Sequence, residues 1–504
     1  MDDATLKNDK KDGTLALKEK KSRSKNSSQN DAGISIISER ELSRELGFKE
    51  AVSIGLGGTI GGGVFSVLGI AAKLAGPAAI LSFVFGGIVG VLIGYSFSKL
   101  SLKYQSAGGS YTFAREAFGR TFSGVFGWLL WVGYLASCSL YAYTFGIYFA
   151  QMINLLTPAH DLSDIGLLRL VFSLFATLLI TLSTVINLVG VKETGKSQNI
   201  IVLIKVIILV AFIAITFPAA VKNAKTNLTP FFIDLEGNPS SNILLGIMLA
   251  VVGTSILFVA YEGMELIPNA TEEIQEPEKN VPRSIYTTII TASIIYILVA
   301  FTALGGTSYT EFAGDPEKAE YALAYAAQPV LGAAGFIIIT IGALFSTASA
   351  YNASLYGSSR LTYVMARESI FPYFFKKVSK KSRVPFVSIL FISIITLVMT
   401  LSLDLQQIAE LASSIFLLLF AIIALASLVL RKKINARFIW PFLGFITSTI
   451  LFGIFFSRII MDLIAGDPSA KITIILFPIL LVLVTIGSLI TMKVQKKSEL
   501  TSKE

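Results

Sequence analysis

Residues 55–65 constrain the fold more than any other stretch, because they place six glycines inside an apolar run. A transmembrane helix needs about 20 apolar residues, and each glycine in a helix interior costs about 1 kcal/mol relative to alanine. Unwound backbone at membrane depth is tolerated only where protein or a wet cavity surrounds it. We therefore predict two half-helices joined by a glycine hinge. Amides at the start of the second half-helix favour an anion, and a substrate carboxylate is the natural candidate.

Two other interpretations of such glycines exist. Gly-xxx-Gly spacing often marks close helix packing in membranes, and Gly86, Gly90 and Gly94 in the next apolar stretch fit that role. A phosphate-binding loop is disfavoured, because no strand precedes the glycines, Ile60 interrupts the GxGxxG spacing and no Gly-Lys-Ser/Thr follows. Taken alone, the stretch leaves a binding hinge and simple packing open.

The composition is that of a polytopic membrane protein. Of the 504 residues, 53% are hydrophobic and only 15% are charged, against about 25% charged in soluble proteins. The net charge of +9 does not indicate nucleic acid, since the basic residues lie in tails and in loops between apolar stretches. With one cysteine, Cys138, and one histidine, His160, we expect neither a disulfide framework nor a Cys/His metal site, and no cofactor.

The N-terminal tail, residues 1–45, is rich in Lys, Ser, Asn and Asp. This composition cannot bury a core, so we predict that most of the tail is disordered. No apolar region follows the first charges, and we therefore expect no cleavable signal peptide. Ser38-Glu39-Arg40-Glu41 fits a capping box, which predicts a short helix leading into the first membrane segment.

Apolar stretches predict about twelve transmembrane helices, in an all-α integral membrane fold. They begin near Phe48, Ala78, Phe122, Leu167, Gln198, Ile243, Ile285, Val330, Phe386, Ile408, Phe438 and Ile472.

Lysines and arginines in the short loops alternate along the chain, which sets the orientation. On the expected cytoplasmic side lie Lys103, Arg115, Arg120, Lys192, Lys196, Lys376, Lys377, Lys380, Lys381, Arg383, Arg431, Lys432, Lys433, Arg437, Lys496 and Lys497. On the expected outer side lie Asp161, Asp164, Glu311, Asp315, Glu317, Glu320 and Asp404. We expect a multi-pass protein of the cell membrane with both termini in the cytoplasm.

Four motifs, in order along the chain, resemble the amino acid–polyamine–organocation permeases. They are the glycine stretch; the loop of residues 103–119 with Gly108-Gly109-Ser110-Tyr111, Arg115 and Phe118-Gly119; residues 258–265 with Thr271-Glu272-Glu273, Lys279-Asn280 and Pro282-Arg283; and Ala350-Tyr351-Asn352 with residues 357–360, Met365-Ala366-Arg367 and Phe371-Pro372. The resemblance covers about residues 48–385, which is most of the predicted fold.

The resemblance implies a LeuT-like fold of two inverted five-helix repeats, a 5+5 inverted repeat, plus two further helices. It places the first repeat at residues 46–220, the second at 243–430, helices 11 and 12 at 437–493 and a cytoplasmic tail at 494–504. The first and sixth helices are broken in this fold. The sequence is compatible, because both segments are interrupted at corresponding positions of the two halves, which is a pointer to a transporter binding site.

Residues from both interruptions are the candidate substrate site. Freed carbonyls in the sixth segment would accept the substrate ammonium, while the first hinge holds its carboxylate; the alternative is a simple kink. The candidate residues are Ile60, Gly61, Gly62 and Gly63 with Val259, Ala260, Tyr261, Glu262 and Gly263.

Glu262 and Glu265 are carboxylates inside an apolar segment, where a charge costs about 2.5–3.5 kcal/mol at the helix centre. Glu265 matches an acidic position common in the family, where it could simply anchor the helix. Glu262 departs from the small or apolar residue usual there. A carboxylate in the pocket would favour a cationic side chain, although a protonated and silent Glu262 is equally compatible.

Lys205 is a charge on the order of 10–12 Å into the fifth apolar segment. Its side chain either snorkels to the inner interface or points into the bundle, where burial favours the neutral amine and makes it a usable proton carrier. The position resembles the fifth-helix lysine of proton-coupled family members, whose amine replaces the sodium ion of related transporters. The resemblance implies partners at Gly57-Gly58 and at a hydroxyl of the eighth helix, for which Ser346, Thr347 and Ser349 are candidates.

The sequence therefore predicts a secondary active transporter that moves amino acids together with protons across the bilayer by alternating access. A polyamine or organic-cation carrier and a proton-independent amino acid exchanger stay open. A channel or a receptor is disfavoured, because neither a repeated pore loop nor a soluble sensor domain is visible, and an enzyme is disfavoured because no catalytic cluster appears. The sequence does not indicate an oligomeric state.

Overall fold

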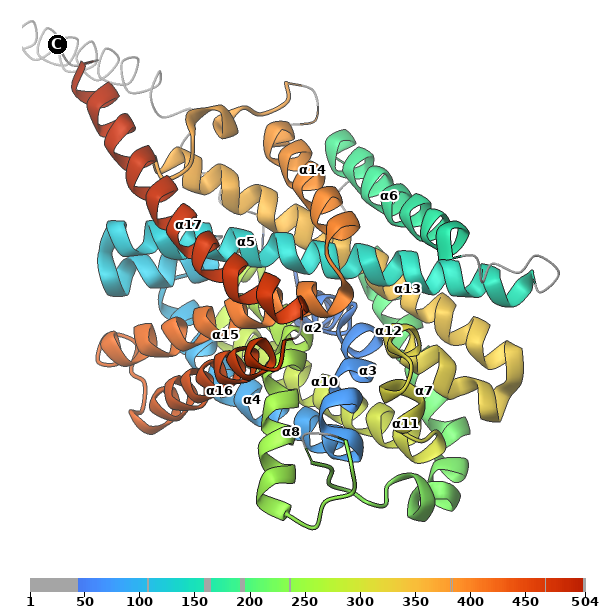
Figure 1. Ribbon diagram of the computed structural model, residues 1–504. Helices are drawn as coiled ribbons and strands as arrows, with labels where there is room; N and C mark the ends of the chain where they lie inside the picture. The colour runs from blue at the N-terminus through green and yellow to red at the C-terminus, as the bar shows by residue number, and fades with distance from the viewer. Residues whose placement is uncertain are drawn as a thin grey trace, which may run out of the picture. The chain divides into compact units, whose positions relative to one another are not determined.

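The computed structural model describes residues 44–106, 108–157, 165–190, 195–234, 237–380, 382, 384–466 and 468–501. These residues are overwhelmingly α-helical, and they form no β-strand beyond two isolated bridges (Figure 1). Residues 45–504 make up one compact unit by their contacts. The predictions for tail residues 1–43, including the short helix near Ser38, lie outside the described residues, as do His160 and the charges of its loop.

The α-helices and 3-10 helices (η) follow one another along the whole described chain. Their bounds are α2 (Phe48–Thr59), α3 (Gly63–Ala75), η2 (Gly76–Ala78), α4 (Ala79–Lys103), α5 (Gly109–Leu156), α6 (Ile165–Val189), α7 (Gly195–Asn227), α8 (Ile243–Leu257), η3 (Phe258–Glu265), α9 (Leu266–Asn269), η4 (Thr271–Glu273), α10 (Pro277–Gly306), α11 (Thr310–Ala313), α12 (Pro316–Glu320), α13 (Ala322–Arg367), η5 (Tyr373–Lys376), α14 (Phe386–Ser402), α15 (Leu405–Val429), α16 (Ile439–Ile464) and α17 (Pro468–Thr501).

Ten helical stretches of the described chain are long and apolar enough to cross a membrane. The first of them, Phe48–Lys103, turns at η2 and so contains two of the predicted segments, α2–α3 and α4. A shorter apolar helix, Phe386–Ser402, corresponds to the predicted ninth segment. All of the segments predicted from hydropathy are therefore present, and the all-α membrane fold is confirmed.

Helices α5 and α13 each consist of two helices joined across a kink at a glycine, so the membrane segments predicted to begin near Phe122 and Val330 start close to these kinks. Gly119 in α5 has φ 82° and Gly332 in α13 has φ 60°, backbone that a residue with a Cβ rarely adopts. The prediction of a loop over 103–119 is partly wrong, since residues 109–118 are helical. The reason is that Tyr111 and Phe113 bury their rings in the core, which stabilises a helix that the polar composition of this stretch concealed.

Helix α5 is the central packing element of the described chain, and it contacts both α13 and α15 extensively. Helix α10 packs against α4 and α7 in the same way. Large exposed apolar side chains gather instead on α6, α7, α16 and α17, for example Leu170, Ile207 and Ile486. Such surfaces suit hydrocarbon rather than water, so these helices are the ones expected to face lipid.

Candidate substrate and coupling site

The first break lies inside the predicted glycine hinge. Helix α2 ends at Thr59, and Ile60 leaves the helical path with φ −81° and ψ 48°. Helix α3 starts again at Gly63 after only two further residues. Every residue of the break is buried, so its backbone polar groups must find partners inside the protein.

The second break takes a different form from the predicted unwound stretch. Residues Phe258–Glu265 form a 3-10 helix between α8 and α9, so the chain changes its winding here rather than opening fully. Ser413 of α15 provides hydrogen-bond partners where α8 meets the 3-10 helix. Its hydroxyl donates to the carbonyl of Ile256 and accepts the Val259 amide at 3.1 Å. A break is present where the sequence predicted it, but fewer carbonyls are freed.

The two breaks touch through their backbones. A Cβ atom placed on Gly263 would lie 2.0 Å from the amide nitrogen of Thr59, and one placed on Gly58 would lie 3.0 Å from the Cα of Gly263. A Cβ on Gly63 would lie 2.5 Å from the Cβ of Ala260. Glycine is required on both sides, because no side chain fits between the two segments.

Carbonyls at the end of α2 are held by side chains from three other helices. Lys205 of α7 donates from Nζ to the carbonyl oxygen of Gly57 at 2.7 Å. Tyr296 of α10 donates to the carbonyl of Thr59. Ser346 of α13 donates to the carbonyl of Ile60. The break is thus stabilised by donors that lie far from it in the sequence, as buried carbonyls at a helix end require.

Lys205 is completely buried and points into the bundle, not toward the interface. Of the three hydroxyl candidates on α13, Ser346 bonds to the hinge, whereas Thr347 donates to the carbonyl of Ala343 in its own helix. The buried hydroxyl of Ser349 has no hydrogen-bond partner among the described residues. The structure therefore brings Lys205, Gly57 and Ser346 to the same break, but it shows no bond from Lys205 to a hydroxyl of α13.

Tyr296 is a site residue that the sequence reasoning missed. Its hydroxyl lies within hydrogen-bonding distance of carbonyls from both breaks, that of Thr59 and that of Ala260 at 3.1 Å. In the sequence it stands in an apolar stretch, where a tyrosine is most simply a packing residue. The only available signal was that a buried tyrosine hydroxyl usually has a partner, and this does not say which one.

We expect Tyr296→Phe to lower the stability of the protein by about 1–3 kcal/mol, because it leaves buried carbonyls without their donor. The apparent Tm of the purified protein in detergent measures this loss. Tyr373→Phe is the control, since Tyr373 is largely exposed and should melt like the wild type. Equal Tm values for wild type and Tyr296→Phe would show that the two breaks do not depend on this hydroxyl.

Glu262 lies in the second break and is buried, with 5% of its surface exposed. Its Oε1 accepts the hydroxyl of Tyr141 at 2.5 Å, and its Oε2 accepts the hydroxyl of Ser137. The ring of Tyr141 covers the first break, since a Cβ on Gly62 would lie 2.6 Å from Tyr141 Cδ1. The side chain of Tyr261 points away and donates to the carbonyl of Phe83 at 2.8 Å, so only the backbone of Tyr261 belongs to the break.

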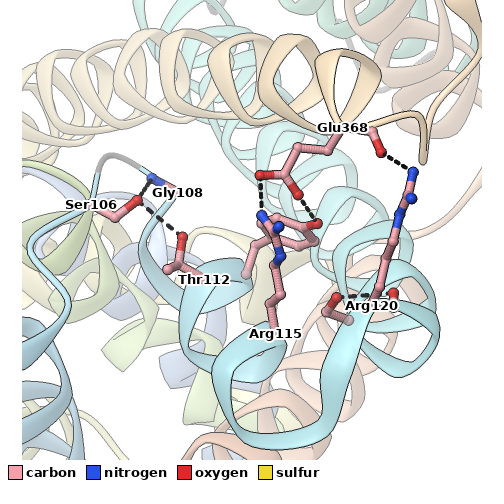
Figure 2. Close-up of polar contacts among 8 residues, drawn as sticks. Ser106, Gly108, Thr112, Arg115, Arg120 and Glu368 are labelled. Atoms are coloured by element: carbon pink, nitrogen blue, oxygen red, sulfur yellow. Dashed lines mark hydrogen bonds and ion pairs between the residues drawn. The ribbon is translucent and has the colours of Figure 1, made fainter. Parts of the chain in front are cut away.

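Motif residues of the segment before Gly119 tie this segment to the end of α13. Figure 2 shows Glu368, which directly follows α13, between the side chains of Arg115 and Arg120. Arg115 and Tyr111 donate to its carboxylate, and Arg120 donates to its carbonyl oxygen at 2.8 Å.

The entrance to α2 and the exit from η4 are joined by backbone hydrogen bonds. The amide of Leu46 donates to the carbonyl of Glu273 at 3.0 Å, and the amide of Gln275 donates to the carbonyl of Leu46 at 2.8 Å. Arg360 of α13 adds an ion pair to Glu273 at 3.7 Å. The two broken segments are therefore linked at one end as well as at their breaks.

Comparison with known families shows to which class of protein this architecture belongs. Residues 50–501 match the family described as amino acid permease. The chain belongs to the amino acid permease family. The resemblance to amino acid–polyamine–organocation permeases seen in the four motifs is thereby confirmed, and the chain is a multi-pass membrane protein of a transporter family.

Several relatives align with most of the length of this permease. It is 32% identical to the inner membrane transport protein YbaT of Escherichia coli, over 78% of this chain and 85% of the relative. It is 29% identical to the methylthioribose transporter of Bacillus subtilis, over 80% and 85% of the two chains. It is 27% identical to the branched-chain amino acid permease BcaP of the same organism, over 78% and 82%.

Proposed function

We propose that this permease carries amino acids into the cell by proton-coupled symport, at the cell membrane, with both termini in the cytoplasm. The observation that supports this most directly is the buried amine of Lys205 on the carbonyl of Gly57. In this proposal the bundle alternates between two openings through a rearrangement of helices of the two five-helix repeats, residues 46–220 and 243–430.

The electrostatics around Lys205 support a change of charge during transport. The C-terminal end of α2 carries partial negative charge, which favours the ammonium form. Complete burial opposes it, since a low dielectric favours the neutral amine. No ion pair of the described residues includes Lys205. A small rearrangement at the end of α2 would then suffice to bind or release a proton.

Substrate binding in this proposal uses the start of α3. The first amides of a helix have no partners within it, and in α3 they are those of the N-cap Gly62 and of Gly63, Val64 and Phe65. Together with the positive end of the helix they suit a carboxylate. Backbone at Val259 and Gly263 in the second break supplies groups for the α-ammonium. Because these contacts would come from the backbone of the protein, they suit amino acids with different side chains.

Uptake into proteoliposomes tests the function. Labelled amino acids are offered first with an inward pH gradient and then, at equal pH on both sides, with an inward sodium gradient. We expect accumulation in the first case and none in the second. The panel includes methylthioribose and polyamines, because one relative is named for the former and the sequence left the latter open. Accumulation driven by sodium, or uptake that requires internal amino acid, would replace symport by a sodium-coupled or an exchange mechanism.

A further inference from the structure

A carboxylate lies at the glycine hinge with neutral partners only. We propose that Glu262 binds the positively charged side chain of the substrate, so that the permease selects amino acids with a cationic side chain over neutral ones of the same shape. This inference rests on the proposed function and adds the substrate class to it.

The residues around Glu262 do not balance the negative charge of its carboxylate, so a group from outside the protein must do so. Its two carboxylate oxygens accept hydroxyls of Ser137 and Tyr141, which lie one helical turn apart on α5. No ion pair of the described chain includes Glu262, and Lys205 donates to the carbonyl of Gly57 instead.

Two hydroxyls hold a carboxylate in place but do not neutralise it. An ionised carboxylate in the membrane interior is costly unless a cation or a proton joins it. An ammonium or guanidinium group of a substrate supplies that cation and meets a carboxylate already oriented by its two donors.

The position of Tyr141 sets the length of the substrate. Its ring lies on Gly62, where the substrate carboxylate is proposed to bind, and its hydroxyl lies on Glu262. The two ends of the site are therefore about one phenol ring apart. The α-ammonium sits on the carbon next to the substrate carboxylate and cannot reach across, whereas the end of a lysine, ornithine or arginine side chain can.

The aromatic ring of the same tyrosine also favours a cation. The face of an aromatic ring attracts cations, and a side chain crossing from Gly62 to Glu262 must pass along this ring. The ring would also exclude water from the path, which strengthens the interaction with the carboxylate. Glu262, Tyr141 and Ser137 thus form one subsite for a cationic side chain.

The test compares three compounds in reconstituted protein under an inward pH gradient. Lysine has both charged ends, norleucine lacks the side-chain ammonium, and cadaverine lacks the carboxylate. We expect wild type to accumulate lysine in preference to both others. In Glu262→Gln the ratio of lysine to norleucine uptake should fall about tenfold or more, the value of one charge-assisted hydrogen bond. Glu262→Asp, which keeps the charge, should retain part of the preference.

Glu265→Gln is the matched control, because Glu265 is an equally buried carboxylate of the same 3-10 helix. Its lysine-to-norleucine ratio should equal that of wild type. An equal fall in both variants would assign the preference to general electrostatics and overturn the specific subsite. An unchanged ratio in Glu262→Gln, or a wild type that takes norleucine as well as lysine, would overturn it directly.

A binding measurement covers the cases in which uptake gives no answer. Lysine should raise the apparent Tm of detergent-purified wild type far more than norleucine does, and this requires no folded variant. Equal shifts from the two compounds would contradict the subsite. If no compound accumulates in vesicles but lysine still stabilises the wild type selectively, the proposed transport function fails while the cation subsite stands. If cadaverine accumulates as well as lysine, the carboxylate site at the glycines fails and Glu262 remains.

Discussion

Lys205→Ala is expected to reduce substrate accumulation driven by a pH gradient to the level of empty vesicles. The variant removes the buried ammonium from the carbonyl of Gly57 and leaves no group there that can bind and release a proton. Movement of substrate down its own gradient does not need that proton, so exchange between labelled and unlabelled substrate should persist. Uptake and exchange measured in the same vesicles separate the loss of coupling from the loss of the protein.

Lys222→Ala serves as the matched control, since Lys222 lies on the same helix but is exposed. It should accumulate substrate like the wild type. A Lys205→Ala protein that still concentrates substrate along the pH gradient would show that the proton travels elsewhere, with Lys205 merely stabilising the end of α2.

Gly263→Ala should be the most damaging single substitution in the two breaks. The added Cβ would lie 2.0 Å from the Thr59 amide nitrogen and 2.3 Å from the Gly58 carbonyl carbon, and both are backbone atoms. A side chain could rotate away, but backbone cannot, so the breaks must separate. Overpacking in a well-packed core costs about 1–3 kcal/mol, and this contact lies at or beyond the upper end. We expect a lower apparent Tm and no measurable transport.

Gly453→Ala provides the comparison for that experiment. Gly453 is a helix-interior glycine of α16 with no atom within 4 Å of the added Cβ. Alanine there should be neutral or stabilising by up to about 1 kcal/mol, because it favours the helix. If Gly263→Ala melts and transports like Gly453→Ala, direct contact between the two breaks is not needed for function.

Features of the site that depend on local sequence were predictable, because their physical cause lies in neighbouring residues. Six glycines in one apolar run cannot form a plain membrane helix, and the chain indeed breaks between Thr59 and Gly63. A lysine in the middle of an apolar segment costs free energy whichever way its side chain points, so Lys205 could be recognised as a candidate functional residue from the sequence alone. Hydropathy located the membrane segments because it too depends only on neighbouring residues.

Partners that come from distant helices could not be predicted in this way. Tyr296, Ser413 and Ser137 look like ordinary packing residues in their own segments, and only the fold shows which groups they meet. The 3-10 winding of residues 258–265 was missed as well. A charged residue and a glycine indicate that a regular helix is interrupted, but the way it is interrupted depends on the donors that surround it.

The backbone bonds of Leu46 to Glu273 and Gln275 have a mechanical consequence. They join the start of the first broken segment to the end of the second. Pulling the two apart at this end would break both bonds and the attached Arg360–Glu273 pair, so the two half-segments should travel together. If this side of the protein opens, the two joined half-segments must then move together, turning about the glycines at which the two breaks touch.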